Sequence, residues 1–241
     1  MLRVGTRSSL LARTQSATIA ALIAEQLGEP CELVPIRSDG DDVSVRLDAP
    51  ARPGIFVATL REALLAGAVN VVVHSFKDLP SAPAPGLMIA AVPARGDARD
   101  VLLTSTGATL EELPADARVG TSSPRRTAAL LRARPDLTVV PIRGNIDSRA
   151  AMVEDGRLDA VVLAKAGLDR IGRTVPAASI LGLDRMVPAP AQGALAIECR
   201  EDDPLARRLA ALEDPESRCV VTAERALPFT FSAGPWERFH L

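Results

Sequence analysis

Strand-like and helix-like segments alternate along most of this chain, and the alternation occurs twice. The first series runs from the strand-like LRVG near the N-terminus to the apolar run LMIAAV, and the second runs from ARVGTSS to ALAIECR. Such alternation is typical of α/β proteins in which helices cover a mainly parallel sheet. The continuous apolar run VNVVVH favours the same arrangement, because a strand covered on both faces is apolar along its whole length. We therefore predict an α/β fold built from two similar halves.

The two halves are joined at two places, around Arg95–Asp100 and around Pro188–Gly193. Two crossings are what a domain needs when a second domain is inserted into it. We predict a discontinuous first domain, residues 1–94 plus 189–211, and a second domain, residues 95–188. Parallel sheets bind ligands at the carboxyl ends of their strands, so two such domains that face each other are expected to form a binding cleft.

The composition narrows the class of protein. The net charge of −2 argues against a general nucleic-acid binder, which is usually strongly basic. No apolar run reaches the ~18 residues of a membrane span. The N-terminal MLRVGTRSSLLAR lacks the apolar core of a signal peptide. We predict a cytoplasmic protein that binds neither nucleic acid nor membrane.

Cysteine and histidine give no sign of a metal or disulfide site. Cys31 and Cys199 lie in apolar, strand-like surroundings and are predicted to be small buried side chains in a reducing compartment. The two histidines, His74 and His240, are far apart in the sequence and no metal-ligand spacing is present. We therefore predict no metal.

Four polar stretches are expected where strands end and loops or helices begin. They are GTRSSLLARTQ (5–15), HSFKDLP (74–80), GTSSPRR (120–126) and IRGNIDSR (142–149). Because the carboxyl ends of parallel strands meet at one edge of a sheet, all four can contribute to one binding site.

The third of these stretches has the features of an anion site. Thr121, Ser122 and Ser123 offer hydroxyl groups at a predicted helix start. The free N–H groups and the positive dipole end of a helix attract anions there. Arg125 and Arg126 add donors suited to carboxylate or phosphate.

Two more arginines, Arg143 and Arg149, come from the next strand end and the helix after it. With the neighbouring pair they suggest a site for a polyanionic small molecule. The other interpretation is that all four arginines face solvent in an arginine-rich chain. Composition alone favours this second interpretation.

The stretch HSFKDLP places an acid beside a base at the end of a buried strand. In a partly desolvated cleft, the Asp78 carboxylate can carry a proton or stabilise a developing cation. Alternatively, Asp78 and Lys77 pair locally in a surface turn that Pro80 ends, and the residues alone do not decide. His74 is expected to be packed at the strand end rather than to act as general base.

Many stretches of the sequence resemble the hydroxymethylbilane synthases, also called porphobilinogen deaminases, in their order and spacing. They are RSSLLARTQ (7–15), GIFVATLREALL (54–65), HSFKDLP (74–80), DARDVLL (97–103), VGTSSPRR (119–126), RPDL (134–137), IRGNIDSR (142–149), LDAVVLAKAGLDRIG (158–172), PAPAQGALAIECR (188–200) and VTAERA (221–226). The resemblance covers residues 1 to about 226 and is highly specific.

The resemblance implies a transferase of tetrapyrrole (porphyrin and haem) biosynthesis. Members of the family condense four porphobilinogen units head to tail into the linear tetrapyrrole hydroxymethylbilane and release ammonia from each unit. They carry a dipyrromethane cofactor on a cysteine and usually work as monomers. Their first two domains resemble periplasmic binding proteins around a cleft, and a small third α+β domain follows.

The resemblance also implies site residues. It places the catalytic aspartate at Asp78, which would hold the pyrrole nitrogens and stabilise the azafulvene cation formed as ammonia leaves. Phe56 is implied as a loop contact, in a stretch where Pro53 replaces the usual lysine. Positions that bind substrate or cofactor fall on Arg7, Ser9, Gln15, Ser75, Lys77, Thr121, Ser122, Ser123, Arg125, Arg126, Arg143, Arg149 and Gln192.

The chain departs from the family after VTAERA. The family continues there with a Gly-Gly-Cys stretch whose cysteine carries the cofactor, whereas this chain reads LPFTFSAGPWERFHL and has no cysteine after Cys219. We therefore expect residues 212–241 to be the remnant of a largely missing third domain with a divergent tail, and the cofactor attachment site to be absent. Two hypotheses remain. The first is a hydroxymethylbilane synthase, and the alternative is either an inactive truncated homologue or a non-catalytic small-anion-binding module, because the cofactor cysteine is absent.

Overall fold

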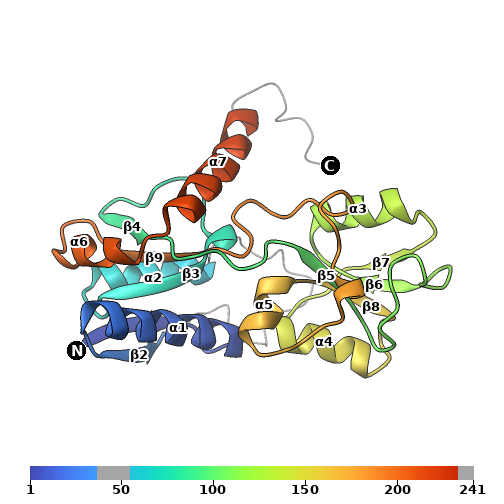
Figure 1. Cartoon of the computed structure of the whole chain (residues 1–241), viewed down its shortest axis with the longest axis horizontal. Helices are drawn as coiled ribbons and strands as arrows, with labels where there is room; N and C mark the ends of the chain where they lie inside the picture. The colour runs from blue at the N-terminus through green and yellow to red at the C-terminus, as the bar shows by residue number, and fades with distance from the viewer. Residues whose placement is uncertain (37–54, 233–241) are drawn as a thin grey trace. The chain divides into compact units, whose positions relative to one another are not determined.

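The structure is a computed structural model that describes the backbone of residues 1–36 and 55–232 and the side chains of residues 1–36 and 57–226. The chain divides into two compact units. The first unit is Met1–Gly96 together with Ala194–Leu241, and the second is Asp97–Gly193. Figure 1 shows the course of the chain through both units.

The first unit is built on a sheet of five described strands in the order β2-β1-β3-β9-β4. The strands β1, β2 and β3 run parallel, and β9 runs antiparallel to both of its neighbours. The strand bounds are β1 Leu2–Thr6, β2 Cys31–Pro35, β3 Val71–Ser75, β4 Leu87–Ala91 and β9 Leu195–Arg200.

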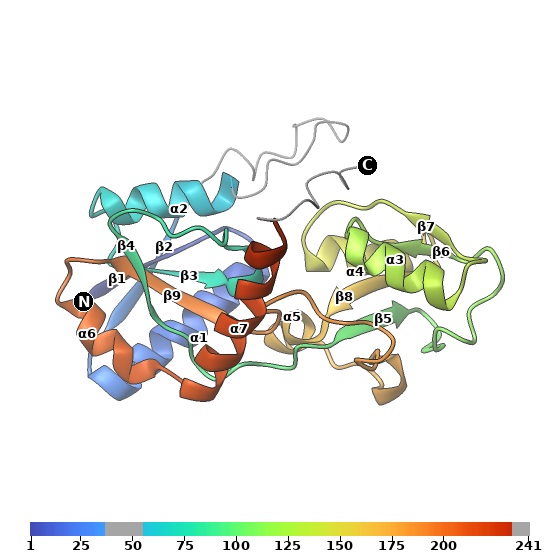
Figure 2. The same ribbon diagram turned by 90° about the horizontal axis from the view of Figure 1, so that it is seen from above.

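Helices cover both faces of this sheet (Figure 2). Along β3, Val71 and Val73 face a core shared with α1 and α6, while Val72 faces a second core with Leu60 and Leu64 of α2. This explains the continuous apolar run that the sequence shows here. The helical elements of the unit are α1 Leu10–Leu27, α2 Ile55–Leu65, η2 Phe76–Asp78, α6 Leu205–Leu209, η4 Ala210–Leu212 and α7 Pro215–Ser232.

The second unit has a sheet of four described strands in the order β5-β8-β6-β7. The strands β6, β7 and β8 are parallel, and β5 is antiparallel to β8. The strand bounds are β5 Asp100–Thr104, β6 Arg118–Gly120, β7 Thr138–Val140 and β8 Ala160–Ala164. The helical elements are α3 Pro124–Ala133, α4 Ile146–Glu154, α5 Lys165–Arg170 and η3 Ala177–Ser179.

The central strand β8 again supplies side chains to two cores. Val162 packs with Leu130 of α3 on one face, and Val161 packs with Val153 of α4 on the other. At the end of β6, a Cβ atom on Gly120 would lie 2.6 Å from Leu158 Cδ1. Close packing therefore requires glycine at the point where the chain leaves the sheet for the loop before α3.

The α/β fold predicted from the alternation of segments is confirmed. The predicted domain boundaries, and the assignment of residues 212–241 to a remnant of a third domain, stay predictions; α7 lies in the first unit, and residues 233–241 lie outside the described part. Among the described residues, none of the helices combines the length and apolar character needed to cross a membrane.

The packing of α3 gives a first prediction. Leu130 is fully buried, and its neighbour Leu131 is 39% exposed on the same helix. We expect Leu130→Ala to lower the free energy of unfolding by about 2–5 kcal/mol, because it removes core contacts and leaves a cavity. The control Leu131→Ala should change it by less than about 0.5 kcal/mol. Urea unfolding followed by circular dichroism measures both, and equal effects would contradict the placement of α3.

Candidate active site

In the first unit, predicted site residues meet at the carboxyl edge of the sheet. Because β1 and β3 are parallel neighbours, Arg7 and Ser9 after β1 lie at the same edge as Lys77 and Asp78 after β3. Ser9 caps α1, with its Oγ accepting a hydrogen bond from the Ala12 N–H at 3.4 Å.

Asp78 is exposed at the end of η2, a single turn of 3-10 helix. Phe76 and Leu79 are buried on either side of it, so the turn packs into the core at both ends and exposes the carboxylate between them. Within the described part of the chain, the carboxylate has no hydrogen bond or ion pair. The local pair with Lys77, which the sequence left open, does not form. Asp78 is therefore available to a ligand.

Two predicted ligand contacts of this unit bond to each other. Gln15 is buried in α1, and its side-chain amide and the Ser75 hydroxyl lie within hydrogen-bond distance, with Nε2 to Oγ at 3.0 Å. This bond ties α1 to the last residue of β3, directly before the turn that carries Asp78. Their predicted contact with substrate stays a prediction.

A buried ionic cluster lies in the sheet behind this edge. Glu198 of β9 is 1% exposed and accepts hydrogen bonds from Arg61 Nη2 at 2.8 Å, while its other oxygen lies 3.0 Å from His74 Nε2. Burial alone would raise the pKa of Glu198, but the His74 and Arg61 bonds outweigh it and hold that pKa below its usual range. His74 is thus a packed, hydrogen-bonded residue, as the sequence favours.

In the second unit, the hydroxyl groups of the loop after β6 have internal partners. Ser123 caps α3 by accepting from the Arg126 N–H at 3.4 Å, and Thr121 Oγ1 accepts from the Ser123 N–H at 3.2 Å. Ser122 Oγ accepts from the Ile142 N–H at 2.8 Å and donates to the Ile142 carbonyl, which joins this loop to the one after β7. Pro124 occupies the first turn of α3, as predicted.

The loop after β7 builds a second helix start at the same edge. Asn145 caps α4 by accepting from the Ser148 N–H at 2.9 Å. Gly144 adopts a φ of 107°, and its carbonyl accepts from Arg149 Nε at 2.9 Å. Arg143 is exposed beside it. The starts of α3 and α4 therefore place two helix N-termini and arginine at one edge, and the positive end of the helix dipole there suits an anion.

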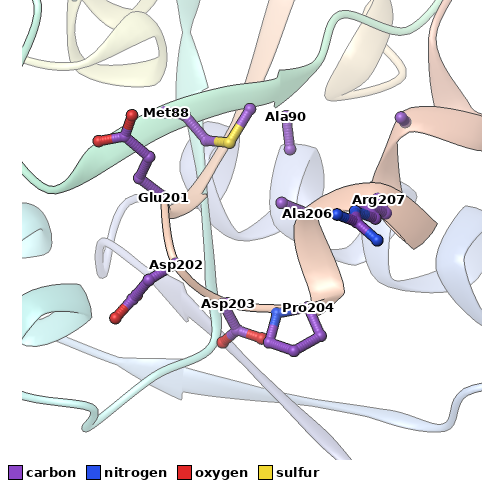
Figure 3. A pocket seen from close by; sticks show the side chains of 9 residues that line it. Met88, Ala90, Glu201, Asp202, Asp203, Pro204, Ala206 and Arg207 are labelled. Carbon is purple, nitrogen blue, oxygen red and sulfur yellow. The ribbon is translucent and has the colours of Figure 1, made fainter.

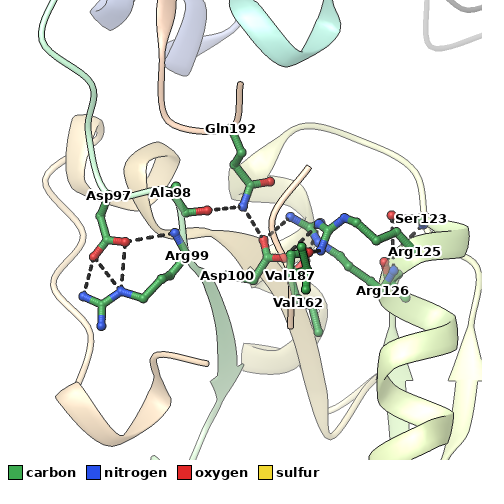
Figure 4. Close-up of polar contacts among 11 residues, drawn as sticks. Asp97, Ala98, Arg99, Asp100, Ser123, Arg125, Arg126, Val162, Val187 and Gln192 are labelled. Carbon is green, nitrogen blue, oxygen red and sulfur yellow. Dashed lines mark hydrogen bonds and ion pairs between the residues drawn. The ribbon is translucent and has the colours of Figure 1, made fainter. Parts of the chain in front are cut away.

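The arginines of α3 are held by a carboxylate that the sequence analysis did not single out. Asp100, the first residue of β5, is fully buried. Its Oδ1 accepts from Arg126 Nη2 at 2.7 Å and from Gln192 Nε2 at 2.8 Å, and its Oδ2 accepts from Arg125 Nη2 at 2.8 Å (Figure 4). Arg125 and Arg126 thus already have a counterion, and their predicted contact with substrate stays a prediction.

This junction holds several separate segments of the second unit together. Gln192 Nε2 also donates to the Ala98 carbonyl at 2.7 Å, and Arg126 Nη1 donates to the Val162 carbonyl at 3.0 Å. Burial would raise the pKa of Asp100, but the guanidinium groups of Arg126 and Arg125 outweigh it and hold that pKa below its usual range. Asp100 is therefore a structural anion.

Sequence reasoning missed Asp100, Glu198 and Arg61. The one available signal was an acidic residue inside an apolar strand, as in ALAIECR, since such a residue must find a buried partner. The predicted loop contact Phe56 lies in the first turn of α2, and its side chain is outside the described part of the structure.

A hollow of about 570 Å³ elsewhere in the first unit contains none of the predicted site residues (Figure 3). It lies between β4 and the start of α6, with Glu201, Asp202 and Asp203 among its lining residues. Three carboxylates outnumber Arg207, the one arginine in the lining, so size alone does not make this hollow a candidate for the anion site.

Comparison with known sequences identifies relatives along nearly the whole chain. Residues 2–226 match the family described as porphobilinogen deaminase, dipyromethane cofactor binding domain. The porphobilinogen deaminase of Nocardia farcinica is 52% identical over 235 residues, which cover 97% of this chain and 67% of that protein. That of Mycolicibacterium gilvum is 51% identical over 236 residues, covering 97% of this chain and 75% of that protein.

Comparison with solved structures shows the fold. A periplasmic substrate-binding protein of an ABC transporter from Coxiella burnetii has a TM-score of 0.55 at 14% identity, covering 92% of this chain and 96% of that one. A nutrient binding protein from Burkholderia cenocepacia has a TM-score of 0.54 at 14% identity, covering 94% and 97%. The expected likeness to periplasmic binding proteins is confirmed.

The Asp100 junction gives a second prediction. Asp100→Asn removes the carboxylate that neutralises two arginines, one of them buried, so we expect the free energy of unfolding at pH 7 to fall by about 3–5 kcal/mol. Because the pKa of Asp100 in the folded state is below its ordinary 3.8, its contribution is complete above that pH and is lost as the pH falls through the folded pKa.

Urea unfolding of the wild type and Asp100→Asn between pH 7 and pH 2 therefore measures a difference that shrinks in acid. The control Asp184→Asn removes a carboxylate that is 81% exposed in the same unit and should have an effect below about 0.5 kcal/mol. A difference that stays constant across the acid range would contradict the assignment of Asp100 as the titrating group.

Proposed function

We propose that this chain, which belongs to the porphobilinogen deaminase family, acts as a hydroxymethylbilane synthase with Asp78 as its catalytic carboxylate. The reaction is a transferase step of tetrapyrrole biosynthesis, in which porphobilinogen units join head to tail into hydroxymethylbilane and release ammonia. The observation that carries the assignment of Asp78 is its exposed carboxylate, which has no partner among the described residues, at the carboxyl edge of the first unit's sheet and in a stretch that resembles the family's catalytic one.

Asp78 suits the charge that develops in this reaction. When the carbon–nitrogen bond of the aminomethyl group breaks, ammonia takes the electron pair and the pyrrole ring with its methylene carbon becomes an azafulvene cation. A fixed carboxylate beside that cation stabilises it. The free α-carbon of another pyrrole then forms the new carbon–carbon bond and loses its proton, a step in which a carboxylate within reach serves as base.

The carboxylate groups of porphobilinogen need cationic and N–H donors. In the second unit, such donors are Arg143 and Arg149 with the starts of α3 and α4. In the first unit, Lys77 precedes Asp78 in the sequence, and Arg7 lies at the same edge of the sheet. Arg125 and Arg126 are already neutralised by Asp100. We assign the primary contact with substrate carboxylates in the second unit to Arg143 and Arg149 because of their place beside the starts of α3 and α4.

The family's dipyrromethane cofactor would supply a fixed end for the growing chain. The described cysteines do not fit its attachment. Cys199 is buried, and burial raises the pKa of its thiol to about 11. Cys31 is half-buried in β2, and burial raises its thiol pKa as well.

Cys219 is exposed on α7. It lies six positions before Arg225, which contacts the Asp78 turn. At ~3.6 residues per turn, a spacing of six positions places the Cys219 and Arg225 side chains about 120° apart around the helix axis. The helix geometry therefore directs position 219 away from the direction of Arg225, which also argues against Cys219 as the attachment site.

We further propose that the chain works as a monomer in the cytoplasm, on a small molecule and without nucleic acid or membrane. The net charge of −2 supports the exclusion of nucleic acid as a partner.

The catalytic assignment predicts a loss of turnover without a loss of binding. We expect Asp78→Ala to lower the rate of hydroxymethylbilane formation at least ~100-fold, because charge stabilisation at the developing cation is lost. The Kd for porphobilinogen should stay within about threefold, since carboxylate contacts supply the binding. The control Asp202→Ala removes an exposed carboxylate of the same unit and should leave both quantities unchanged.

Product formation is measured by absorbance after oxidation to porphyrin, binding by calorimetry, and any dipyrromethane adduct by intact mass. Wild-type protein that neither binds nor converts porphobilinogen would overturn the proposal. Saturable binding without product would favour the non-catalytic anion-binding module instead.

Binding itself should depend on Arg143, an exposed arginine in the loop between β7 and α4 of the second unit. Arg143→Ala removes one charge-assisted contact, so we expect the Kd for porphobilinogen to rise about tenfold or more. The matched control Arg157→Ala removes an arginine that is 59% exposed and already paired with Asp155. Calorimetry checks both variants, and a Kd for Arg143→Ala equal to that of the control would remove Arg143 from the site.

A further inference from the structure

The turn that exposes Asp78 is held by an arginine from another part of the chain. Arg225, in the VTAERA segment of α7, donates from Nη1 to the carbonyls of Phe76 at 3.1 Å and Leu79 at 3.0 Å. Its Nη2 donates to the Pro80 carbonyl at 2.6 Å. One guanidinium group therefore binds carbonyl oxygens on both sides of Asp78.

The same guanidinium group also stacks on the turn. Its Cζ lies 4.6 Å from the centroid of the Phe76 ring, and that ring is only 7% exposed. Among the described residues, no carboxylate pairs with Arg225. Its donors go to backbone carbonyls of the turn, which indicates that the contact shapes this segment and does not neutralise a charge.

The turn needs such support. It is a single 3-10 turn closed by one backbone hydrogen bond, from the Leu79 N–H to the Phe76 carbonyl at 3.2 Å. Short 3-10 turns have poor hydrogen-bond geometry, and the carbonyls that follow the turn, here those of Leu79 and Pro80, lack partners within it. Asp78 has no side-chain partner of its own in the described structure. Its position therefore depends on what holds the backbone on either side.

We propose that Arg225 is a positioning residue for Asp78. Arg225 binds the carbonyls of residues 76, 79 and 80 and stacks on Phe76. These contacts fix the backbone of the turn and so the direction in which the Asp78 side chain points. The planar fork of arginine suits this task, because it reaches several acceptors at once where lysine presents one point charge. The consequence for turnover rests on the proposed function.

The same helix contains a matched control. Arg218 also donates to a backbone carbonyl of the first unit, that of Ile89 at 3.1 Å, and also bonds Glu213. It ties α7 to β4 without touching the Asp78 turn. Arg218→Ala therefore tests whether the loss of a different contact between α7 and the first unit's sheet affects the Asp78 turn as much as the loss of Arg225 does.

The first measurement follows the turn itself, by amide hydrogen exchange in the full chain of the wild type, Arg225→Ala, Arg225→Lys and Arg218→Ala. We expect Arg225→Ala to speed exchange at residues 77–79 and 81, above all at the Leu79 N–H, and to leave exchange in β1 unchanged; Pro80 has no amide hydrogen. Arg225→Lys should give a smaller increase, and Arg218→Ala none in this segment. Unchanged exchange in Arg225→Ala, or an equal increase in Arg218→Ala, would overturn the proposal.

The second measurement follows turnover of porphobilinogen. A misplacement of a catalytic group by about 1 Å can cost ~100-fold in rate, so we expect kcat of Arg225→Ala to fall about 10- to 100-fold, with KM within about threefold. Arg225→Lys should retain more activity, and added guanidinium ion should restore part of the loss in Arg225→Ala. Arg218→Ala should keep kcat within about twofold.

The two measurements separate the possible failures. If the wild type does not convert porphobilinogen, the proposed function fails, and the exchange experiment alone decides whether Arg225 holds the turn. If the wild type is active and Arg225→Ala changes only KM, or loses activity in step with a loss of folded protein, the positioning role is wrong. Thermal unfolding of each variant supplies the folded fraction.

Discussion

Each unit depends on a carboxylate that is buried in its sheet and neutralised by arginine. Asp100 begins β5 and collects Arg125, Arg126 and Gln192. Glu198 lies within β9 and collects Arg61 and His74. A buried carboxylate is costly unless several donors satisfy it, so each one specifies how helices and loops far apart in sequence must come together.

These junctions divide the arginines of the chain into two groups. Arg61 and Arg126 are committed to internal carboxylates and stabilise the units. Arg143 and Arg149 follow the end of β7, next to the capped starts of α3 and α4, and they are the arginines to which we assign the substrate carboxylates. A simple count of arginines around the GTSSPRR stretch does not reveal this division, because the internal anions come from other strands. The set of arginines that we assign to substrate binding is therefore smaller than the set implied by family resemblance.

Much of the fold and of the site could be predicted from local pattern. The continuous apolar run at β3 indicated a strand covered on both faces, and Pro124 marked the start of α3. The exposure of Asp78 agrees with its place after a buried strand. The pairs that hold the site were not predictable, since Arg61 and Glu198 are 137 positions apart and Arg225 and Leu79 are 146 apart. The hydrogen bonds of Ser122 to Ile142 and of Gln192 to Ala98 were not predictable for the same reason. The segments that they join meet only in the folded chain.

The contrast between the three carboxylates explains why Asp78 is held in an indirect way. Asp100 and Glu198 are fixed by arginine, and the same bonds that fix them occupy their oxygens. A carboxylate that must meet a cation formed on a substrate has to keep its oxygens available. Such a carboxylate therefore cannot be oriented by an ion pair of its own, and the backbone must set its position. Buried Phe76 and Leu79 fix where the turn lies, and Arg225 fixes its carbonyls, so that orientation is achieved at residues flanking Asp78 while the carboxylate itself has no partner among the described residues.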